Sequence, residues 1–260
     1  AGAISVPAYT TNTEADHLHI LSDCGAKGAI VSTRKLAERL RPAATKAPDL
    51  EFLIAIEPPD IDQVSSFDLH SLDAVQNMGK GGHENVVEMA GRWKPDDTAC
   101  IIYTSGTGGA PKGVMLSHKA IMHNCAGAED ALADIGLGNE TFLSFLPLSH
   151  SYEHSAGQFF PISIGAEIYY AEGVETLASN MIEAKPTIMT AVPRLYEMLY
   201  QRITAGVRKT GGTKEKLFNK ALTLGTKRYQ TGRLGLIENI QNAVLEKLVR
   251  NKVRGRFGGR

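Results

Sequence analysis

Residues 101–115 read Ile-Ile-Tyr-Thr-Ser-Gly-Thr-Gly-Gly-Ala-Pro-Lys-Gly-Val-Met, and most expectations about this chain follow from them. An apolar run with strand character ends at Thr104 and opens into a loop rich in hydroxyl groups and glycine that closes at Lys112. Glycines let backbone N–H groups turn toward an anion without a Cβ in the way, while hydroxyls and an ammonium group supply further donors. The stretch therefore predicts a strand followed by a loop that binds a polyphosphate.

Two common phosphate loops do not fit these residues. A Walker loop ends in Gly-Lys-Ser/Thr, whereas Lys112 stands between Pro111 and Gly113, so no hydroxyl follows it to bind magnesium. A dinucleotide-binding fingerprint needs a third glycine where this chain has Pro111. Both interpretations are therefore excluded.

The loop instead resembles the signature of the AMP-forming adenylating enzymes, a superfamily of acyl-CoA synthetases, luciferases and peptide-synthetase adenylation domains. That pattern, Tyr-Thr-Ser-Gly-Thr-Thr-Gly-x-Pro-Lys-Gly, matches residues 103–113 with one departure, because Gly108 replaces the second threonine and removes one hydroxyl contact. The resemblance implies that loop residues bind the β and γ phosphates of ATP and that Thr104 also contacts Mg²⁺. The implied phosphate-binding residues are Thr104, Ser105, Gly106, Thr107, Gly108, Gly109 and Lys112.

A second polar cluster follows roughly forty residues later. Residues 144–154 read Ser-Phe-Leu-Pro-Leu-Ser-His-Ser-Tyr-Glu-His, so a short strand delivers polar residues to its carboxyl end, where open parallel sheets bind ligands. The cluster resembles the second signature of the superfamily, which implies that His150 is the catalytic residue beside the α-phosphate and the acyl carboxylate. The form Leu-Pro-Leu-Ser-His-x-x-Glu is most similar to the long-chain fatty acid branch and leaves Glu153 without an assigned role.

The same cluster permits another interpretation. His150 to His154 also spell His-x-x-Glu-His, the zinc-site arrangement of inverted zinc peptidases. Such a site needs a third ligand downstream, for which Glu175 and Glu183 are candidates, but a peptidase leaves the phosphate loop unexplained. A nearer alternative is an adenylating enzyme that acts on a medium-chain, aryl or amino acid.

The resemblance implies a two-step acid–thiol ligase. A fatty acid carboxylate attacks the α-phosphorus of Mg-ATP to give acyl adenylate and pyrophosphate, and the thiol of CoA then displaces AMP. ATP, Mg²⁺ and CoA are thus the expected cofactors and co-substrates. A third feature, Val-Pro-Arg-Leu-Tyr-Glu at 192–197, is similar to a segment of the long-chain synthetases.

The expected fold class is α/β, because strand-like runs alternate with amphipathic helices in the pattern of mostly parallel sheets covered on both faces, a layered αβα arrangement. The expected strands are 3–6, 29–31, 51–56, 100–104, 141–145, 166–171 and 187–190. The expected helices are 14–22, 32–40, 117–132, 175–184, 193–203 and 236–253. We expect the second helix to stop before Pro42, and the third to follow the loop directly so that its N-terminal dipole helps to hold the anion. Residues 58–82 are expected to be the least regular part of the chain, a linker or a surface excursion.

The resemblance also implies a domain organisation. Residues 1–205 are expected to form part of the large N-terminal adenylation domain, and residues 206–260 a basic helical extension of the same domain. The sequence contains no Tyr-Gly-x-Thr-Glu motif for magnesium, no Thr-Gly-Asp motif for ribose and no small C-terminal domain with its adenylation lysine. We therefore expect an internal fragment that is inactive alone.

The formal charge of the chain is zero, but this conceals an asymmetry. Residues 201–260 hold fifteen Lys or Arg and three Glu, a net charge of +12, whereas the first 200 residues carry −12. A basic surface of this kind favours an anionic partner. We expect 206–260 to contact an anionic membrane, with a solvated helix face or a contact to the absent domain as open alternatives. Specific nucleic-acid binding is not expected, since only Phe218, Tyr229 and Phe257 are aromatic there.

Cysteine usage and hydropathy indicate the compartment. Cys24, Cys100 and Cys125 are few and lack CxxC spacing, which favours a reducing environment. No apolar run approaches the ~20 residues that a membrane-spanning helix needs. A cytoplasmic location is the resulting expectation.

Overall fold

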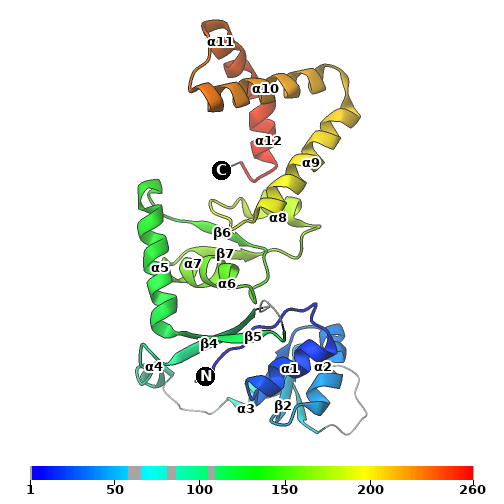
Figure 1. Ribbon diagram of the computed structural model, residues 1–260, viewed down its shortest axis with the longest axis vertical. Helices are drawn as coiled ribbons and strands as arrows, with labels where there is room; N and C mark the ends of the chain where they lie inside the picture. The colour runs from blue at the N-terminus through cyan, green and yellow to red at the C-terminus, as the bar shows by residue number, and fades with distance from the viewer. Residues whose placement is uncertain (1, 58–65, 81–85, 105–108, 260) are drawn as a thin grey trace. The chain divides into compact units, whose positions relative to one another are not determined.

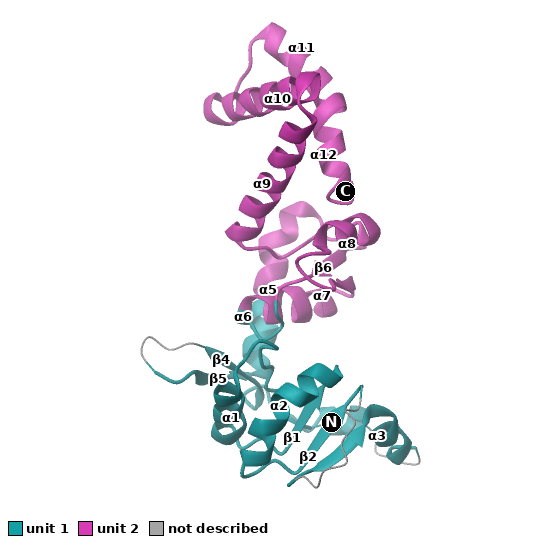
Figure 2. Ribbon diagram, turned by 90° about the vertical axis from the view of Figure 1, so that its right-hand side faces the viewer, with its two compact units in different colours: residues 1–126, 147–151 teal, residues 127–146, 152–260 magenta. Residues whose placement is uncertain are grey.

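The computed structural model describes residues 2–57, 66–80, 86–104 and 109–259 (Figure 1). The chain divides into two compact units (Figure 2). Unit 1 comprises residues 1–126 and 147–151, and unit 2 comprises residues 127–146 and 152–260. Both units contain parallel strands and helices, which confirms the expected α/β class.

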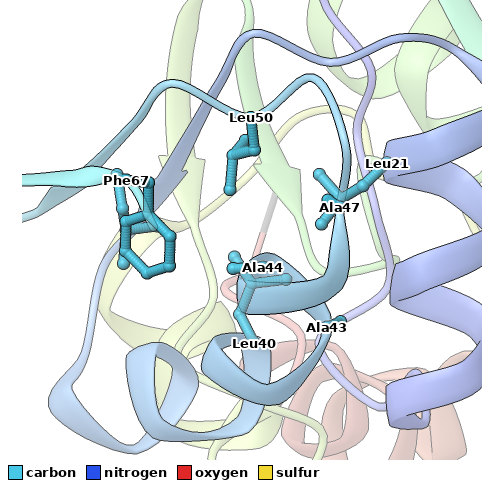
Figure 3. Packing of buried hydrophobic residues seen from close by; sticks show 8 residues of the cluster. Leu21, Leu40, Ala43, Ala44, Ala47, Leu50 and Phe67 are labelled. Carbon is cyan, nitrogen blue, oxygen red and sulfur yellow. The ribbon is translucent and has the colours of Figure 1, made fainter. Parts of the chain in front are cut away.

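Unit 1 contains a parallel sheet of three strands, Gly28–Val31 (β1), Phe52–Ala55 (β2) and Asp68–Ser71 (β3). Helices α1 (Glu14–Asp23) and α2 (Arg34–Lys46) pack against each other. The first begins where sequence predicts, because Thr13 and Asp16 form a reciprocal capping box. Buried apolar side chains from both helices, from β2 and from the segments that adjoin these elements and β3 form the core, part of which Figure 3 shows: Leu21, Leu40, Ala43, Ala44, Ala47, Leu50, Leu53 and Phe67.

The expectation that the second helix ends before Pro42 is wrong. Helix α2 begins after the Thr33 cap and continues through Pro42 to Lys46. A proline inside a helix removes one backbone hydrogen bond. Ala43 and Ala44 are both 0% exposed, and their burial in the core offsets that loss.

The expectation that residues 58–82 lack regular structure is wrong where the structure describes them. Residues 68–71 form β3, paired in parallel with β2, and Leu72–Met78 form helix α3. The Ser71 hydroxyl caps this helix by accepting a hydrogen bond from the Ala74 backbone N–H at 3.1 Å. Glycines and prolines dominate only the flanks of this region, and a short strand and helix fit between them.

The phosphate loop connects an antiparallel hairpin, which the sequence analysis did not predict. Strand β4 (Thr98–Thr104) pairs with β5 (Lys112–Ser117), and helix α5 (His118–Leu132) begins only after β5. The expectation that the helix follows the loop directly is therefore wrong, since a strand of 6 residues separates them. The expected strand at 3–6 is reduced to a bridge from Ser5 to Cys100. A short helix, α4 (Val86–Ala90), precedes the hairpin.

Unit 2 is built on the parallel pair β6 (Thr141–Ser144) and β7 (Glu167–Tyr170). The expected strand at 187–190 is reduced to a bridge between Ile188 and Phe142, because the amides of Thr187 and Ile188 both bond to the Thr141 carbonyl oxygen. The 3-10 turn Ala133–Ile135 (η1) precedes β6. Three short helical turns connect β6 to β7: Ser151–Glu153 (α6), the π-helical His154–Phe159 (η2) and Phe160–Ser163 (α7). The core contains Leu143, Leu177, Met181, Leu195 and Leu199.

The remaining chain is helical, as expected. Its elements are Leu177–Ala184 (α8), Pro193–Thr210 (α9), Gly212–Thr231 (α10), Leu236–Leu245 (α11), the π-helical Glu246–Arg250 (η3) and Asn251–Gly255 (α12). Helix α9 runs across residue 205, where a boundary between the partial domain and its basic extension remains a prediction. In the described part of the chain, every helix is too short or too polar to span a bilayer.

Candidate functional site

The two ends of the predicted phosphate loop face each other across the hairpin. Thr104 ends β4, Lys112 begins β5, and the two residues are register partners. Both are exposed, and among the described residues none forms an ion pair or hydrogen bond with the Lys112 side chain. A Cβ built on Gly109 meets no atom of the described residues within 4 Å. Ser105, Gly106, Thr107 and Gly108 lie outside the described residues.

The hairpin needs glycine immediately after the loop. A Cβ at Gly113 lies only 2.9 Å from Cγ2 of Ile101 and 3.0 Å from Cζ of Tyr103. Both contacts are with β4, the strand that delivers Thr104. The Pro-Lys-Gly end of the motif therefore keeps the backbone close to β4 as well as supplying a cation.

Helix α1 holds both ends of the loop, and the sequence analysis missed this role. Nε2 of His19 lies 2.7 Å from the Pro111 carbonyl oxygen, so the ring donates to the residue before Lys112. The Tyr103 hydroxyl, beside Thr104, donates to Oδ2 of Asp23 at 2.6 Å. Residues four apart share a helix face, which explains how His19 and Asp23 reach the two strands together. That spacing on an amphipathic helix was the available sequence signal, but no motif marked it.

Tyr103 is buried near the end of β4, next to Thr104. Its ring packs edge-on against His19 with centroids 5.9 Å apart. Burial, followed by the hydrogen bond to Asp23, raises the pKa of the Tyr103 hydroxyl. The hydroxyl therefore remains protonated and keeps donating to Asp23 at neutral pH.

His150 belongs to the same compact unit as the loop ends. Residues 147–151 group with unit 1, which also contains Thr104 and Lys112. The His150 side chain is exposed, and its backbone N–H donates to the Pro147 carbonyl oxygen at 2.9 Å in a tight turn before α6. The role of His150 beside the α-phosphate stays a prediction.

The His-x-x-Glu-His pattern does not present its glutamate to solvent. Glu153 is 0% exposed and accepts hydrogen bonds from Ser144 and Thr190. His154 is buried and packs edge-on against Phe159, with ring centroids 4.9 Å apart. Glu175, a candidate third ligand, instead forms an ion pair with Arg202 at 3.5 Å. Among the described residues, no three His, Cys, Asp or Glu side chains are grouped to hold a metal ion.

The loop ends suit a nucleotide polyphosphate with its magnesium ion. The exposed Lys112 ammonium provides positive charge, and the Thr104 hydroxyl provides an oxygen of the kind that Mg²⁺ prefers. These described residues fit Mg-ATP, with Thr104 as the one metal-binding candidate among them.

Comparison with known proteins agrees with this chemistry. The sequence pattern of the family described as AMP-binding enzyme matches residues 1–258. Long chain acyl-CoA synthetase 6, peroxisomal, of Arabidopsis thaliana is 28% identical over 99% of this chain and 36% of its own length. Human long-chain-fatty-acid–CoA ligase ACSBG2 is 30% identical over 99% of this chain and 39% of its own length. The chain thus spans well under half of these relatives.

Solved structures share the fold. The adenylation domain of a carboxylate reductase from Mycobacterium chelonae superposes with a TM-score of 0.70 at 19% identity, covering 100% of this chain and 38% of that one. An anthranilate CoA ligase structure in complex with anthranoyl-AMP gives a TM-score of 0.57 at 23% identity, covering 76% and 37%. The described elements therefore correspond to part of an adenylate-forming fold.

Proposed function

Because this chain belongs to the family of AMP-binding enzymes, we propose that it is part of an AMP-forming ligase that activates a long-chain fatty acid. The reaction consumes ATP, forms an acyl adenylate with release of pyrophosphate, and passes the acyl group to CoA. Relatives named as long-chain acyl-CoA synthetases, matched over 99% of this chain, support the substrate class. ATP use follows from the family, while Mg²⁺ and CoA are parts of the proposal.

The observation that carries the proposal is the pairing of Thr104 with Lys112 across the hairpin. In the first step an anionic carboxylate approaches an anionic phosphate, and the leaving pyrophosphate gains negative charge. Lys112 would neutralise that charge and the Thr104 hydroxyl would donate to a phosphate oxygen. A bound Mg²⁺ would supply further positive charge to the same phosphates. His150, exposed in the same unit, would donate to the reacting carboxylate or α-phosphate.

The test is pyrophosphate release by the full-length protein that carries this sequence. With ATP and Mg²⁺ present, palmitate should give release and benzoate or mixed amino acids should not. Release with benzoate or an amino acid alone would overturn the fatty acid assignment but keep the adenylating chemistry. Release with none of these acids would overturn both. The 260-residue chain tested alone should release none, because it matches only 36–39% of these relatives' length.

We also propose that residues 206–260 dock on an anionic membrane, the source of long-chain acids. Helix α11 and the turn after it expose an apolar stripe, with Ile237 72%, Ile240 68%, Val244 50% and Leu248 47% exposed. Lys247 and Lys252 are exposed beside it. Basic residues near an anionic bilayer contribute about 1 kcal/mol each, and exposed apolar side chains insert at the interface.

Co-sedimentation of the full-length protein with phosphatidylserine vesicles tests this docking. Binding should fall with added salt and with the double variant Lys247→Glu and Lys252→Glu. The matched variant Lys35→Glu and Lys119→Glu changes the charge equally on exposed positions of α2 and α5 and should bind as the parent does. Binding indifferent to lipid charge would contradict docking and would point to a contact with other parts of the protein.

A further inference from the structure

Glu153 is a buried carboxylate for which the proposed chemistry gives no role. Its side chain is 0% exposed. The Ser144 hydroxyl donates to Oε1 at 2.6 Å, and the Thr190 hydroxyl donates to Oε2. Among the described residues, no Lys or Arg forms an ion pair with it. Both carboxylate oxygens are therefore held by neutral hydroxyl groups from two other segments.

Stability alone does not account for this arrangement. A carboxylate that is removed from water loses the favourable free energy of its hydration. Hydrogen bonds from two hydroxyl groups restore only part of that free energy. Proteins in which well-packed apolar side chains replace buried charged groups are often as stable as the parent protein or more stable. Charged side chains are normally exposed, and exceptions to this rule are expected at functional sites, where the placement of a group matters more than the free energy of unfolding.

The network joins three segments of the chain. Ser144 is the last residue of β6, Thr190 follows the bridge at Ile188, and Glu153 ends α6. The hydrogen bond between Ser144 and Glu153 closes the intervening stretch, which contains the tight turn from Pro147 to His150. The two ends of the stretch that carries His150 are thus fixed to each other.

Gly157 lies against the Glu153 carboxylate, at a position where any side chain would collide with it. A Cβ at that position would lie 2.2 Å from Oε1 and 2.4 Å from Cδ of Glu153. Gly157 lies in the π-helical turn that follows α6, and such turns occur frequently at functional sites. The absence of a Cβ at Gly157 therefore leaves the space that the Glu153 carboxylate occupies.

We propose that Glu153 is a positioning residue that fixes the turn carrying His150. It acts through Ser144 and Thr190 and does not itself contact substrate. The proposal rests on the proposed function, because that function gives His150 its place beside the reacting groups.

The experiment compares variants of the full-length protein in two measurements. Steady-state pyrophosphate release gives kcat and KM, and hydrogen–deuterium exchange follows peptides that cover residues 144–153. The variants are Glu153→Gln, Glu153→Ala, and the partner variants Ser144→Ala and Thr190→Val. Glu153→Gln keeps the shape and one acceptor oxygen, and its NH2 group can donate to the other hydroxyl once that hydroxyl turns to accept. Thr187→Val is the matched control, since Thr187 ties the same segment to Thr141 and Glu140 at the opposite end of β6.

Glu153→Ala should lower kcat about 10- to 100-fold with KM for ATP within about 3-fold, because small misplacement of a reacting group is costly. Ser144→Ala and Thr190→Val should each lower kcat by a smaller factor, and Glu153→Gln should restore most of it. Exchange at 144–153 should rise in Glu153→Ala but not in Thr187→Val. If Glu153→Ala does not fold, the two partner variants decide the outcome.

Unchanged exchange at 144–153 in Glu153→Ala and in both partner variants would overturn the positioning role, whatever the activity. An equal loss of kcat in Thr187→Val would also overturn it, because the effect would then be general to the fold. A parent protein that releases no pyrophosphate would overturn the proposed function instead, while the exchange measurement would still decide whether Glu153 fixes the turn.

Discussion

Nε2 of His19 lies 2.7 Å from the carbonyl oxygen of Pro111, so helix α1 is tied to the residue that precedes Lys112. A carbonyl oxygen only accepts, and the imidazole must therefore carry its proton on Nε2. Together with the bond from Tyr103 to Asp23, this contact ties α1 to both sides of the hairpin.

Replacing His19 should weaken nucleotide binding more than it weakens the fold. One hydrogen bond contributes about 0.5–1.5 kcal/mol, so His19→Ala should raise KM for ATP about 3- to 10-fold. His123→Ala is the control, since His123 is exposed on α5. Steady-state pyrophosphate release measures both, and an unchanged KM in His19→Ala would contradict the role of α1.

Lys112→Met should remove the positive charge at the loop while keeping the length of the side chain. Hydrogen bonds to charged groups contribute about 1.5–3 kcal/mol, so kcat/KM for ATP should fall about 10- to 100-fold. Lys119→Met alters a lysine of α5 that is 70% exposed and should have little effect. Equal activity of Lys112→Met and the parent would remove Lys112 from the phosphate site.

Tyr103→Phe should make the free energy of unfolding less dependent on alkaline pH. Burial and the Asp23 hydrogen bond raise the pKa of Tyr103 in the folded state, so folding favours the protonated hydroxyl. This contribution is complete below the unfolded pKa of about 10 and is lost as pH rises toward the higher folded pKa. At pH 7 the variant should be about 1 kcal/mol less stable.

Urea unfolding from pH 7 to pH 11 checks this prediction. The difference between the parent and Tyr103→Phe should narrow above pH 10. Tyr229→Phe, at a tyrosine that is 91% exposed, should follow the parent throughout. If the free energy of unfolding depends on pH in the same way for the parent and for Tyr103→Phe, then ionisation of this hydroxyl is not coupled to folding.

Gly157→Ala should reverse the usual effect of replacing glycine in a helix. Alanine normally stabilises a helix interior by about 1 kcal/mol. At Gly157 the new Cβ meets the Glu153 carboxylate, and overpacking should instead destabilise by about 1–3 kcal/mol. Gly206→Ala in α9, where a Cβ meets nothing within 4 Å, should be neutral or stabilising. Thermal unfolding of both variants measures the contrast, and equal shifts would contradict it.

Local sequence patterns predicted most helices and strands because their signals lie within a few residues. The Thr13 cap starts α1, the apolar run before Thr104 forms β4, and proline starts α9. The predictions failed where distant packing overrides a local signal. Pro42 stays inside α2 because the alanines after it are buried in the core.

By itself, the sequence predicted a polyphosphate-binding loop, because glycine, hydroxyl groups and one lysine in a fixed order limit which ligand the backbone accepts. It also determined the family through residues 1–258. Only the tertiary structure decided that Lys112 starts a strand opposite Thr104, that His19 holds Pro111, and that Glu153 is buried. Those facts depend on contacts between residues 8 to 92 positions apart, and no local pattern encodes such pairs.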